Sequence, residues 1–280
     1  MATPMHMPGA GYAAGIVSAV LDDALAAGAF VLGISGLQGS GKSTLAGQVC
    51  AEAARRGLRC ACLSLDDVYL PRAARRRLAR DVHPLLATRG PPGTHEPALA
   101  IDALDALRAG RAVALPRFDK LADEREPRAR WPGAGPVDLV VLEGWCLGTP
   151  PEPPGALAAP LNALEREDDP DGGWRRWCND ALARDYPPLW RRIDRLCLLQ
   201  APSFEVVAGW RAEAERAMAA ARPGAPAMDA AAIERFVQHF ERTSRQAQRT
   251  LPARADVVLP LDARRRPLGA PRIRPAAPAR

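Results

Sequence analysis

Five short apolar runs are spaced along the chain, and turn or helix signals bound each of them. They cover residues 30–35, 59–65, 138–143, 193–199 and 256–261. The stretches between them show the periodicity of amphipathic helices at residues 43–56, 98–109, 174–184, 203–221 and 229–250. Strands that alternate with helices predict right-handed crossovers and a parallel sheet covered on both faces. We therefore expect an α/β protein, with one more amphipathic helix, residues 16–27, packed on the sheet ahead of the first strand.

The first apolar run leads into a glycine-rich turn, and a helical stretch follows it. The turn reads Gly36-Leu37-Gln38-Gly39-Ser40-Gly41-Lys42-Ser43-Thr44. Strand, glycine loop and helix in this order are the context of a phosphate-binding P-loop. The glycines let successive backbone N–H groups turn inward around the phosphates, and the helix adds the positive end of its dipole. We expect this P-loop to bind ATP, with Lys42 on the β- and γ-phosphate oxygens and Ser43 as a ligand of Mg²⁺.

Arginine supplies almost all of the positive charge. The chain has 38 basic residues, of which only Lys42 and Lys120 are lysines, and its net charge is +6. Residues 263–280 hold six arginines and no acidic residue, so the remainder of the chain is neutral overall. The excess charge therefore belongs to a basic, Pro-rich tail that we expect to be disordered, and a binding surface for nucleic acid is not expected.

The six cysteines show neither CxxC pairs nor a disulfide framework. We interpret them as buried free thiols in a reducing cytosol. The first fifteen residues lack the basic and apolar segments of a signal peptide, and no run approaches the length of a membrane span. We expect a cytoplasmic protein without a membrane partner, either a monomer or a homodimer.

Two of the apolar runs end in acidic residues. The second is followed by Asp66 and Asp67, and the third ends at Glu143. Ligands of open parallel sheets bind beyond the carboxyl ends of the strands, so these carboxylates should lie beside the triphosphate. Phosphoryl transfer needs a carboxylate to hold the metal and one to accept the proton of the substrate hydroxyl. We expect Ser43, Asp66 and Glu143 to lie at the metal, and Asp66 to act as the base. Asp67 fits a cap of the next turn as well as it fits the site.

Together these motifs resemble the plant and fungal-type D-glycerate 3-kinases, which belong with the uridine kinases, phosphoribulokinases and pantothenate kinases. Beyond the P-loop, the resemblance rests on Asp66-Asp67-Val68-Tyr69, Gly93-Thr94-His95, Phe118-Asp119-Lys120 and residues 142–148, and it continues through residues 209–215 and 228–240. It covers roughly residues 30–262 and implies a P-loop NTPase fold of three αβα layers around a five-stranded parallel sheet. It also implies an ATP- and Mg²⁺-dependent kinase whose acceptor is a small hydroxylated acid.

The resemblance suggests roles for further residues. It favours Asp66 over Asp67 as the base, because the first acid after the second strand has this role in the wider group. Arg211 matches the lid arginine that contacts the phosphates during transfer, and alternatively it forms an i,i+4 ion pair with Glu215.

Four residues are expected on the substrate side: Tyr69, His95, Asp119 and Lys120. Lys120 matches the lysine of the family's Tyr-Asp-Lys turn and, as a point charge, would hold a substrate carboxylate. His95 fits this site as well as it fits a cap of the following helix.

Two segments depart from the family pattern. Residues 121–131 stand where the resembling proteins carry a glycine-rich stretch with arginine, and residues 239–243 replace a Tyr-Met-Pro-x-Tyr pattern. Both lie where we expect the acceptor pocket or the lid, so the acceptor is the open question. D-glycerate is the favoured acceptor, with an alcohol of the uridine, pantothenate or sugar-phosphate type as the alternative. A non-kinase, ATP-dependent regulatory module is the third hypothesis.

The predicted organisation is one domain with insertions. An N-terminal helical segment, residues 1–29, precedes a kinase domain over residues 30–262, and the tail covers residues 263–280. Within the domain, residues 67–137 form a substrate-side insertion that is too long for a single crossover, and residues 200–250 form the lid and the C-terminal helices.

Overall fold

Six strands form the central sheet of the computed structural model, in the order β10-β9-β8-β1-β7-β2. The structure describes residues 11–221 and 228–275. Five strands run parallel and match the five apolar runs: β1 (Val31–Gly36), β2 (Cys60–Ser64), β7 (Leu139–Gly144), β8 (Arg195–Gln200) and β9 (Val257–Pro260). The predicted α/β fold with a parallel sheet is confirmed.

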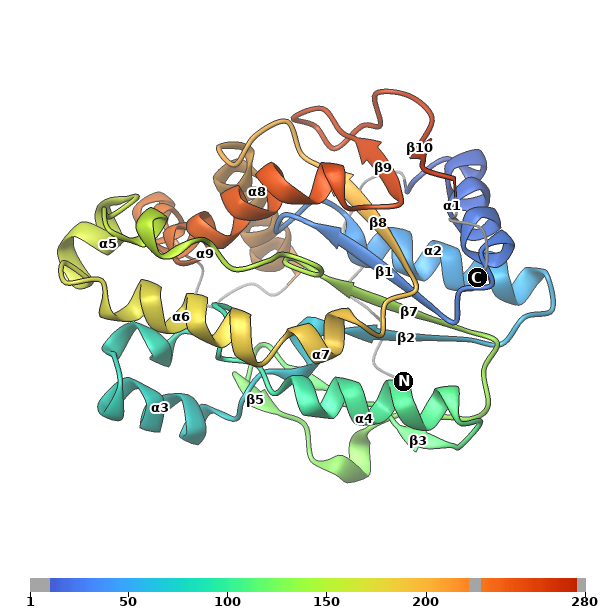
Figure 1. Cartoon of the computed structure of the whole chain (residues 1–280), viewed down its shortest axis with the longest axis horizontal. Helices are drawn as coiled ribbons and strands as arrows, with labels where there is room; N and C mark the ends of the chain where they lie inside the picture. Colours follow the sequence, from blue (N-terminus) through green and yellow to red (C-terminus); the bar gives the residue numbers. More distant parts are fainter. Residues whose placement is uncertain (1–10, 222–227, 276–280) are drawn as a thin grey trace.

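The strand side chains alternate between two hydrophobic cores, one on each face of the sheet. In β1, Leu32 and Ile34 pack with α1 (Ala14–Ala26) and α2 (Lys42–Arg55), whereas Val31 belongs to the other core. That other core takes side chains from α4 (Pro97–Arg108), α6 (Gly173–Arg184), α7 (Pro187–Trp190) and α9 (Ala230–Thr250). Helices therefore cover both faces, as the three predicted αβα layers require (Figure 1).

The other described elements are short or lie outside these layers. They are α3 (Arg72–Asp81), α5 (Ala163–Asp168), α8 (Val206–Ala221), β3 (Val113–Ala114), β4 (Phe118–Asp119), β5 (Glu124–Arg125) and β6 (Gly133–Ala134). Single 3-10 turns are η1 (Leu65–Val68), η2 (Pro84–Ala87), η3 (Arg128–Arg130), η4 (Pro154–Leu157) and η5 (Leu251–Ala253). Because β3 pairs with β6 and β4 with β5, the long insertion after β2 contains α3, α4 and two small antiparallel pairs.

The register of the sheet brings the ends of three strands together. Glu143 of β7 is paired with Ile34 of β1 on one side and with Ser64 of β2 on the other. Since the three strands are parallel, the segments that follow them leave the sheet at the same edge. The P-loop after β1 and Asp66 after β2 are therefore brought to either side of Glu143.

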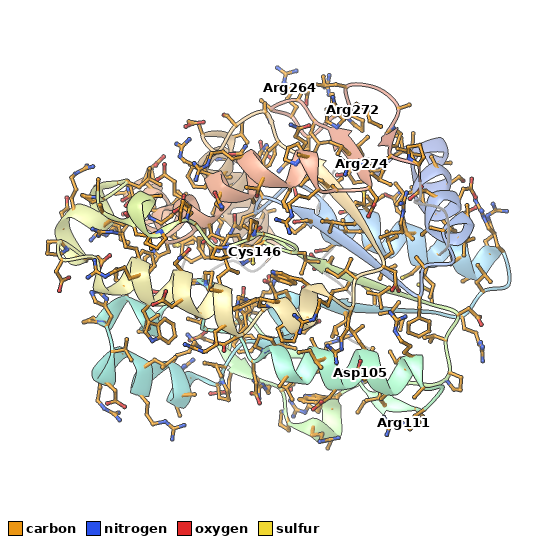
Figure 2. The ribbon with its side chains drawn as sticks, in the orientation of Figure 1. Asp105, Arg111, Cys146, Arg264, Arg272 and Arg274 are labelled. Carbon is orange, nitrogen blue, oxygen red and sulfur yellow. The ribbon has the colours of Figure 1, made fainter. Side chains whose placement is uncertain are left out.

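The C-terminal segment corrects two expectations, a sheet of five strands and a disordered tail. A sixth strand, β10 (Arg272–Ile273), pairs antiparallel with β9 at the edge of the sheet. Without β10, the edge of β9 would leave backbone groups unpaired. Arg272 and Arg274, both labelled in Figure 2, lie in and next to β10. Arg272 donates to Gln200 at 2.9 Å, and Arg274 donates to the Ala253 carbonyl at 2.8 Å. The basic side chains thus find oxygen partners on the body of the protein. Residues 276–280 of the expected tail lie outside the described residues.

The cysteines are all free thiols, but they are not all buried as expected. Cys146, Cys178 and Cys197 are buried, whereas Cys50, Cys60 and Cys62 are half-buried where α2 meets β2. The helices that the structure describes include none that is long and apolar enough to cross a membrane.

Candidate active site

The P-loop joins β1 to α2 through backbone conformations that favour glycine. Gly39 and Gly41 have φ angles of 78° and 94°, in the left-handed region. A Cβ atom at Gly39 would also lie 2.8 Å from Cβ of Trp210, and one at Gly41 would lie 2.8 Å from the hydroxyl of Tyr12. The backbone angles favour glycine at both positions, and at Gly39 the lack of space requires it as well.

The polar groups of the loop fit a phosphate ligand. Lys42 is only 8% exposed, and its Nζ donates to the Leu37 carbonyl at 3.0 Å. Burial lowers the pKa of Lys42, although Glu143 and Asp66 favour its charged form. The hydroxyl of Ser40 and the amide of Gln38 are buried without a partner among the described residues. Unpaired buried donors are the groups that phosphate oxygens would satisfy, so the loop fits the triphosphate of ATP.

Ser43 and Glu143 place two oxygen ligands side by side. The hydroxyl of Ser43, at the start of α2, donates to Oε1 of Glu143 at 3.1 Å, and Glu143 is 7% exposed. No group of three or more His, Cys, Asp or Glu side chains suited to a metal occurs among the described residues. This small donor set fits Mg²⁺, which is held by few protein oxygens and keeps water and phosphate ligands. Asp66, the third expected ligand, has its side-chain hydrogen bonds elsewhere.

Asp66 lies in η1, directly after β2, and pairs with two residues of the substrate side. Its Oδ1 accepts from the Tyr69 hydroxyl and its Oδ2 from Nζ of Lys120, both at 2.6 Å. Burial alone would raise the pKa of Asp66, but Lys120 and Tyr69 outweigh it and hold that pKa below its usual range. Asp66 is therefore a carboxylate at neutral pH.

Asp67 has the capping role that the sequence left open. Its Oδ2 accepts from the backbone N–H of Ser64 at 3.3 Å, and the Ser64 hydroxyl accepts in return from within η1. Arg117 also donates to Oδ2, at 3.1 Å. Burial raises the pKa of Asp67 to about 6, against the opposing effect of Arg117.

Two of the four expected substrate-side residues, Tyr69 and His95, form an aromatic cluster with Phe118 beside Asp66. The rings of Tyr69 and His95 stack with centroids 4.7 Å apart, and the edge of Phe118 packs on Tyr69 at 5.2 Å. Backbone bonds on either side of Tyr69 join its segment to the His95 segment, since Leu70 N–H donates to the Thr94 carbonyl and Glu96 N–H to the Val68 carbonyl. Two loops from distant parts of the insertion are thereby fixed against each other.

Asp119 shapes the turn that carries Lys120. Its Oδ1 accepts from the backbone N–H groups of Leu121 and Ala122, at 2.8 and 3.0 Å. Lys120 follows on an exposed turn, with its ammonium group directed to Asp66. Asp119 thus stabilises the turn, and Lys120 supplies the positive charge that faces Asp66.

Arg211 makes the ion pair that was the alternative to phosphate contact. It pairs with Glu215 one helical turn further along α8, and its guanidinium lies over the ring of Phe236 at 5.0 Å. Its neighbour Trp210 packs against Gly39 instead and donates from Nε1 to the Ala263 carbonyl at 2.8 Å. Arg211 therefore follows a residue that contacts the P-loop, but its own contacts are with side chains of α8 and α9.

Two residues that contact the P-loop were missed by the sequence analysis. The Tyr12 hydroxyl donates to the Ser40 carbonyl at 2.9 Å. Arg265 approaches the Gly39 carbonyl at 3.5 Å, lies over the Trp210 ring at 5.7 Å and pairs with Glu213. Neither Tyr12 nor Arg265 belongs to a sequence motif. Arg265 lies between two other arginines in the basic C-terminal segment.

No protein family model matches the chain. The uncharacterized kinase mug58 of Schizosaccharomyces pombe is 35% identical over 221 residues, which are 75% of this chain and 78% of that protein. The chloroplastic D-glycerate 3-kinase of Arabidopsis thaliana is 29% identical over 222 residues, but the chain spans only 46% of it. A solved D-glycerate 3-kinase from Cryptococcus neoformans var. grubii has the same fold, with a TM-score of 0.70 at 24% identity over 92% of this chain and 97% of that one.

Proposed function

The chain belongs to the D-glycerate 3-kinase family of P-loop kinases, and from this premise we propose that it phosphorylates D-glycerate with ATP. The products would be 3-phosphoglycerate and ADP. Membership of the family makes the chain an ATP-dependent phosphotransferase with an alcohol group as acceptor. We choose an acid as the acceptor because Nζ of Lys120 lies 2.6 Å from Oδ2 of Asp66.

That contact pairs one anionic and one cationic group beside the P-loop. A substrate with a carboxylate and a hydroxyl complements both, because the ammonium of Lys120 would take the carboxylate and Asp66 would take the hydroxyl. A neutral acceptor such as uridine would separate the ion pair without offering Lys120 a counter-charge. The ion pair therefore favours an anionic alcohol.

On the nucleotide side, Lys42 and the backbone N–H groups of the P-loop would bind the phosphates of ATP. Ser43 and Glu143 would hold Mg²⁺, which when bound would neutralise charge on the β- and γ-phosphates. Arg211 would reach the phosphates only after exchanging its ion pair with Glu215 for them, which requires a movement of the lid.

Asp66 would orient the hydroxyl of the acceptor and take its proton. In the transfer, a bond forms between the acceptor oxygen and the γ-phosphorus, and the bond from that phosphorus to the β–γ bridging oxygen breaks. The bridging oxygen leaves on ADP, and the proton of the hydroxyl ends on Asp66. Lys42 would stabilise the charge that develops on the phosphate oxygens.

We also propose that the enzyme acts in the cytoplasm, because all six cysteines are free thiols. The name of the Arabidopsis relative assigns that protein to the chloroplast.

A panel of acceptors tests the substrate. ADP release is measured with D-glycerate, L-glycerate, glycerol, uridine and pantothenate, and Lys42→Met serves as the inactive control. We expect kcat/KM for D-glycerate to exceed that for glycerol by at least about 100-fold, because glycerol has no carboxylate to pair with the ammonium of Lys120. A preference for uridine or pantothenate would overturn the choice of acceptor. ADP release that no acceptor stimulates would favour a regulatory ATPase.

A further inference from the structure

Tyr186 joins the substrate-side cluster through a hydrogen bond to His95. The residue lies between α6 and α7, and its side chain is fully buried. Its hydroxyl oxygen is 2.9 Å from the backbone nitrogen of Gly93 and 2.7 Å from Nδ1 of His95. One phenol group thus contacts both the loop that carries His95 and its ring.

These two contacts determine where the imidazole carries its proton. The backbone N–H of Gly93 can only donate, so the Tyr186 oxygen accepts from it. The phenol has a single hydrogen, and among the described residues its remaining contact is Nδ1 of His95. That hydrogen is paired only if Nδ1 accepts it, and this arrangement leaves the ring hydrogen on Nε2. Burial lowers the pKa of His95 to about 4, although Asp66 opposes this, so the ring is neutral near pH 7.

The resulting Nε2–H group is a buried donor that lacks a protein partner. His95 is 4% exposed, and its Nε2 has no hydrogen-bond partner among the described residues. Buried donors in folded proteins are nearly always paired, and an unpaired one loses free energy that a ligand oxygen can restore. The ring stacks on Tyr69, whose hydroxyl binds the proposed base Asp66. The unpaired donor therefore belongs to the acceptor side of the site.

We propose that Tyr186 holds His95 as the Nε2–H tautomer and that this N–H donates to the carboxylate of the acceptor substrate. The identity of the acid rests on the proposed function. Nε2–H and the Lys120 ammonium can only donate, whereas the Asp66 carboxylate can only accept. Two donor groups and one acceptor group match a molecule whose carboxylate accepts from His95 and Lys120 and whose hydroxyl donates to Asp66. Tyr186 is then a positioning residue that acts through His95.

The tautomer is tested directly by ¹⁵N NMR of the protein labelled in its four histidines. The signals of His95 are assigned by their loss in His95→Gln. We expect a protonated Nε2 and an unprotonated Nδ1 in the wild-type protein, and a mixture of tautomers or a shift toward Nδ1–H in Tyr186→Phe. A wild-type ring protonated on Nδ1 would overturn the inference, and this measurement needs neither substrate nor activity.

The donor role is tested by two substitutions that place an amide at different points of the ring. The Gln side chain brings its NH₂ near the position of Nε2, whereas the Asn side chain brings it near Nδ1. We expect His95→Asn to raise KM for D-glycerate by about 10- to 100-fold, as for loss of a hydrogen bond to a charged group, with KM for ATP unchanged. His95→Gln should retain more of the affinity, and Tyr186→Phe should lie between wild type and His95→Asn.

Two controls distinguish the loss of a hydrogen bond to the substrate carboxylate from a general loss of affinity. With glycerol, which has no carboxylate, His95→Asn should change KM by less than about twofold. His83→Asn, in a histidine whose Nδ1 accepts from the backbone N–H of Leu85, is the matched control and should leave KM for D-glycerate unchanged. Equal losses for glycerol and D-glycerate, or equal effects of Asn and Gln, would overturn the donor role. Failure of the proposed function would show differently, as wild-type enzyme that does not turn over D-glycerate.

Discussion

Asp66 and Asp67 are adjacent in the sequence but have different partners. Asp66 is bound by Tyr69 and Lys120, which a substrate could displace, whereas Asp67 is bound by the backbone of Ser64 within its own turn. Of the two, Asp66 alone faces the aromatic cluster that would hold an acceptor. The surroundings, and not the residue type, therefore distinguish the proposed base Asp66 from the capping residue Asp67.

Asp66→Asn should lower kcat by about 100- to 10,000-fold, because the amide cannot accept the proton of the hydroxyl. The affinity for ATP, measured by calorimetry, should remain unchanged. Asp67→Asn is the matched control and should lower stability by about 1 kcal/mol through the weakened cap, with kcat little affected. Similar losses of kcat in the two variants would remove the assignment of Asp66.

Buried, neutral His95 should make the protein sensitive to acid. Burial lowers its pKa from 6.5 in the unfolded chain to about 4 in the fold, so between these values the unfolded state binds more protons. Stability is therefore highest above pH 6.5 and falls as the pH drops toward 4. Between about pH 7 and pH 5, this loss should be on the order of 2 kcal/mol larger in wild type than in His95→Gln. Urea unfolding at the two pH values measures it, and parallel losses in both proteins would contradict the burial argument.

Motif residues could be predicted from the sequence, whereas their partners could not. Lys42, Ser43 and Glu143 follow from the P-loop and from an acid at a strand end, and Ser43 does contact Glu143. The contact of Lys120 with Asp66 spans 54 residues, and that of Tyr186 with His95 spans 91. Such pairs depend on how the insertion folds over the sheet, and local pattern carries no information about that.

The P-loop is the element on which nucleotide binding depends, and its shape depends on glycine. At Gly39 a side chain would meet both an unfavourable φ of 78° and the Cβ of Trp210 on α8. Gly110 has a similar φ of 70°, but a Cβ there would have no heavy atom within 4 Å. Comparing substitutions at Gly39 and Gly110 therefore separates the effect of the backbone conformation on stability from the effect of contact with Trp210.

Gly110→Ala should lower stability by about 1 to 2 kcal/mol, the effect of a left-handed backbone conformation alone. Gly39→Ala should lower it further and should also raise KM for ATP, because the loop and α8 must move apart. Urea unfolding and ATP titrations of the two variants check this. If both variants keep the wild-type KM for ATP and lose the same stability, the contact between Trp210 and the loop is not important.

The parallel strands were predictable because each is apolar on both faces of the sheet, and this gives a continuous run in the sequence. The strand β10 could not be predicted in this way. Arg272 and Ile273 are exposed, and they pair with β9 through backbone hydrogen bonds. The sequence of an exposed edge strand shows little hydrophobic periodicity. In a segment rich in Arg and Pro, such a sequence resembles that of a disordered region.

On the scale of the whole molecule, both ends of the described chain return to the P-loop. Tyr12, ahead of α1, binds the Ser40 carbonyl, and Arg265, after β9, lies against Gly39 and Trp210. The segment after β9 also pairs with the sheet through β10. Segments outside the predicted domain limits of residues 30–262 therefore contact the P-loop.

Arg265→Ala should raise KM for ATP by about 3- to 10-fold, because it removes a guanidinium beside the phosphate loop. Arg264→Ala is the matched control, since Arg264 lies at the periphery of the molecule (Figure 2) and is exposed. Steady-state kinetics with varied ATP at saturating acceptor measure the effect. Identical KM values for the two variants would show that the C-terminal segment does not contribute to nucleotide binding.

Transfer of the γ-phosphoryl group to the 3-hydroxyl of D-glycerate can be observed by ³¹P NMR without proton decoupling. The enzyme is incubated with ATP, Mg²⁺ and D-glycerate, and the new phosphorus signal is observed. Phosphate on the CH₂ carbon couples to two protons, so we expect a triplet. A doublet would mean phosphorylation of the 2-hydroxyl, and a singlet of inorganic phosphate would mean hydrolysis of ATP; either would contradict the claim.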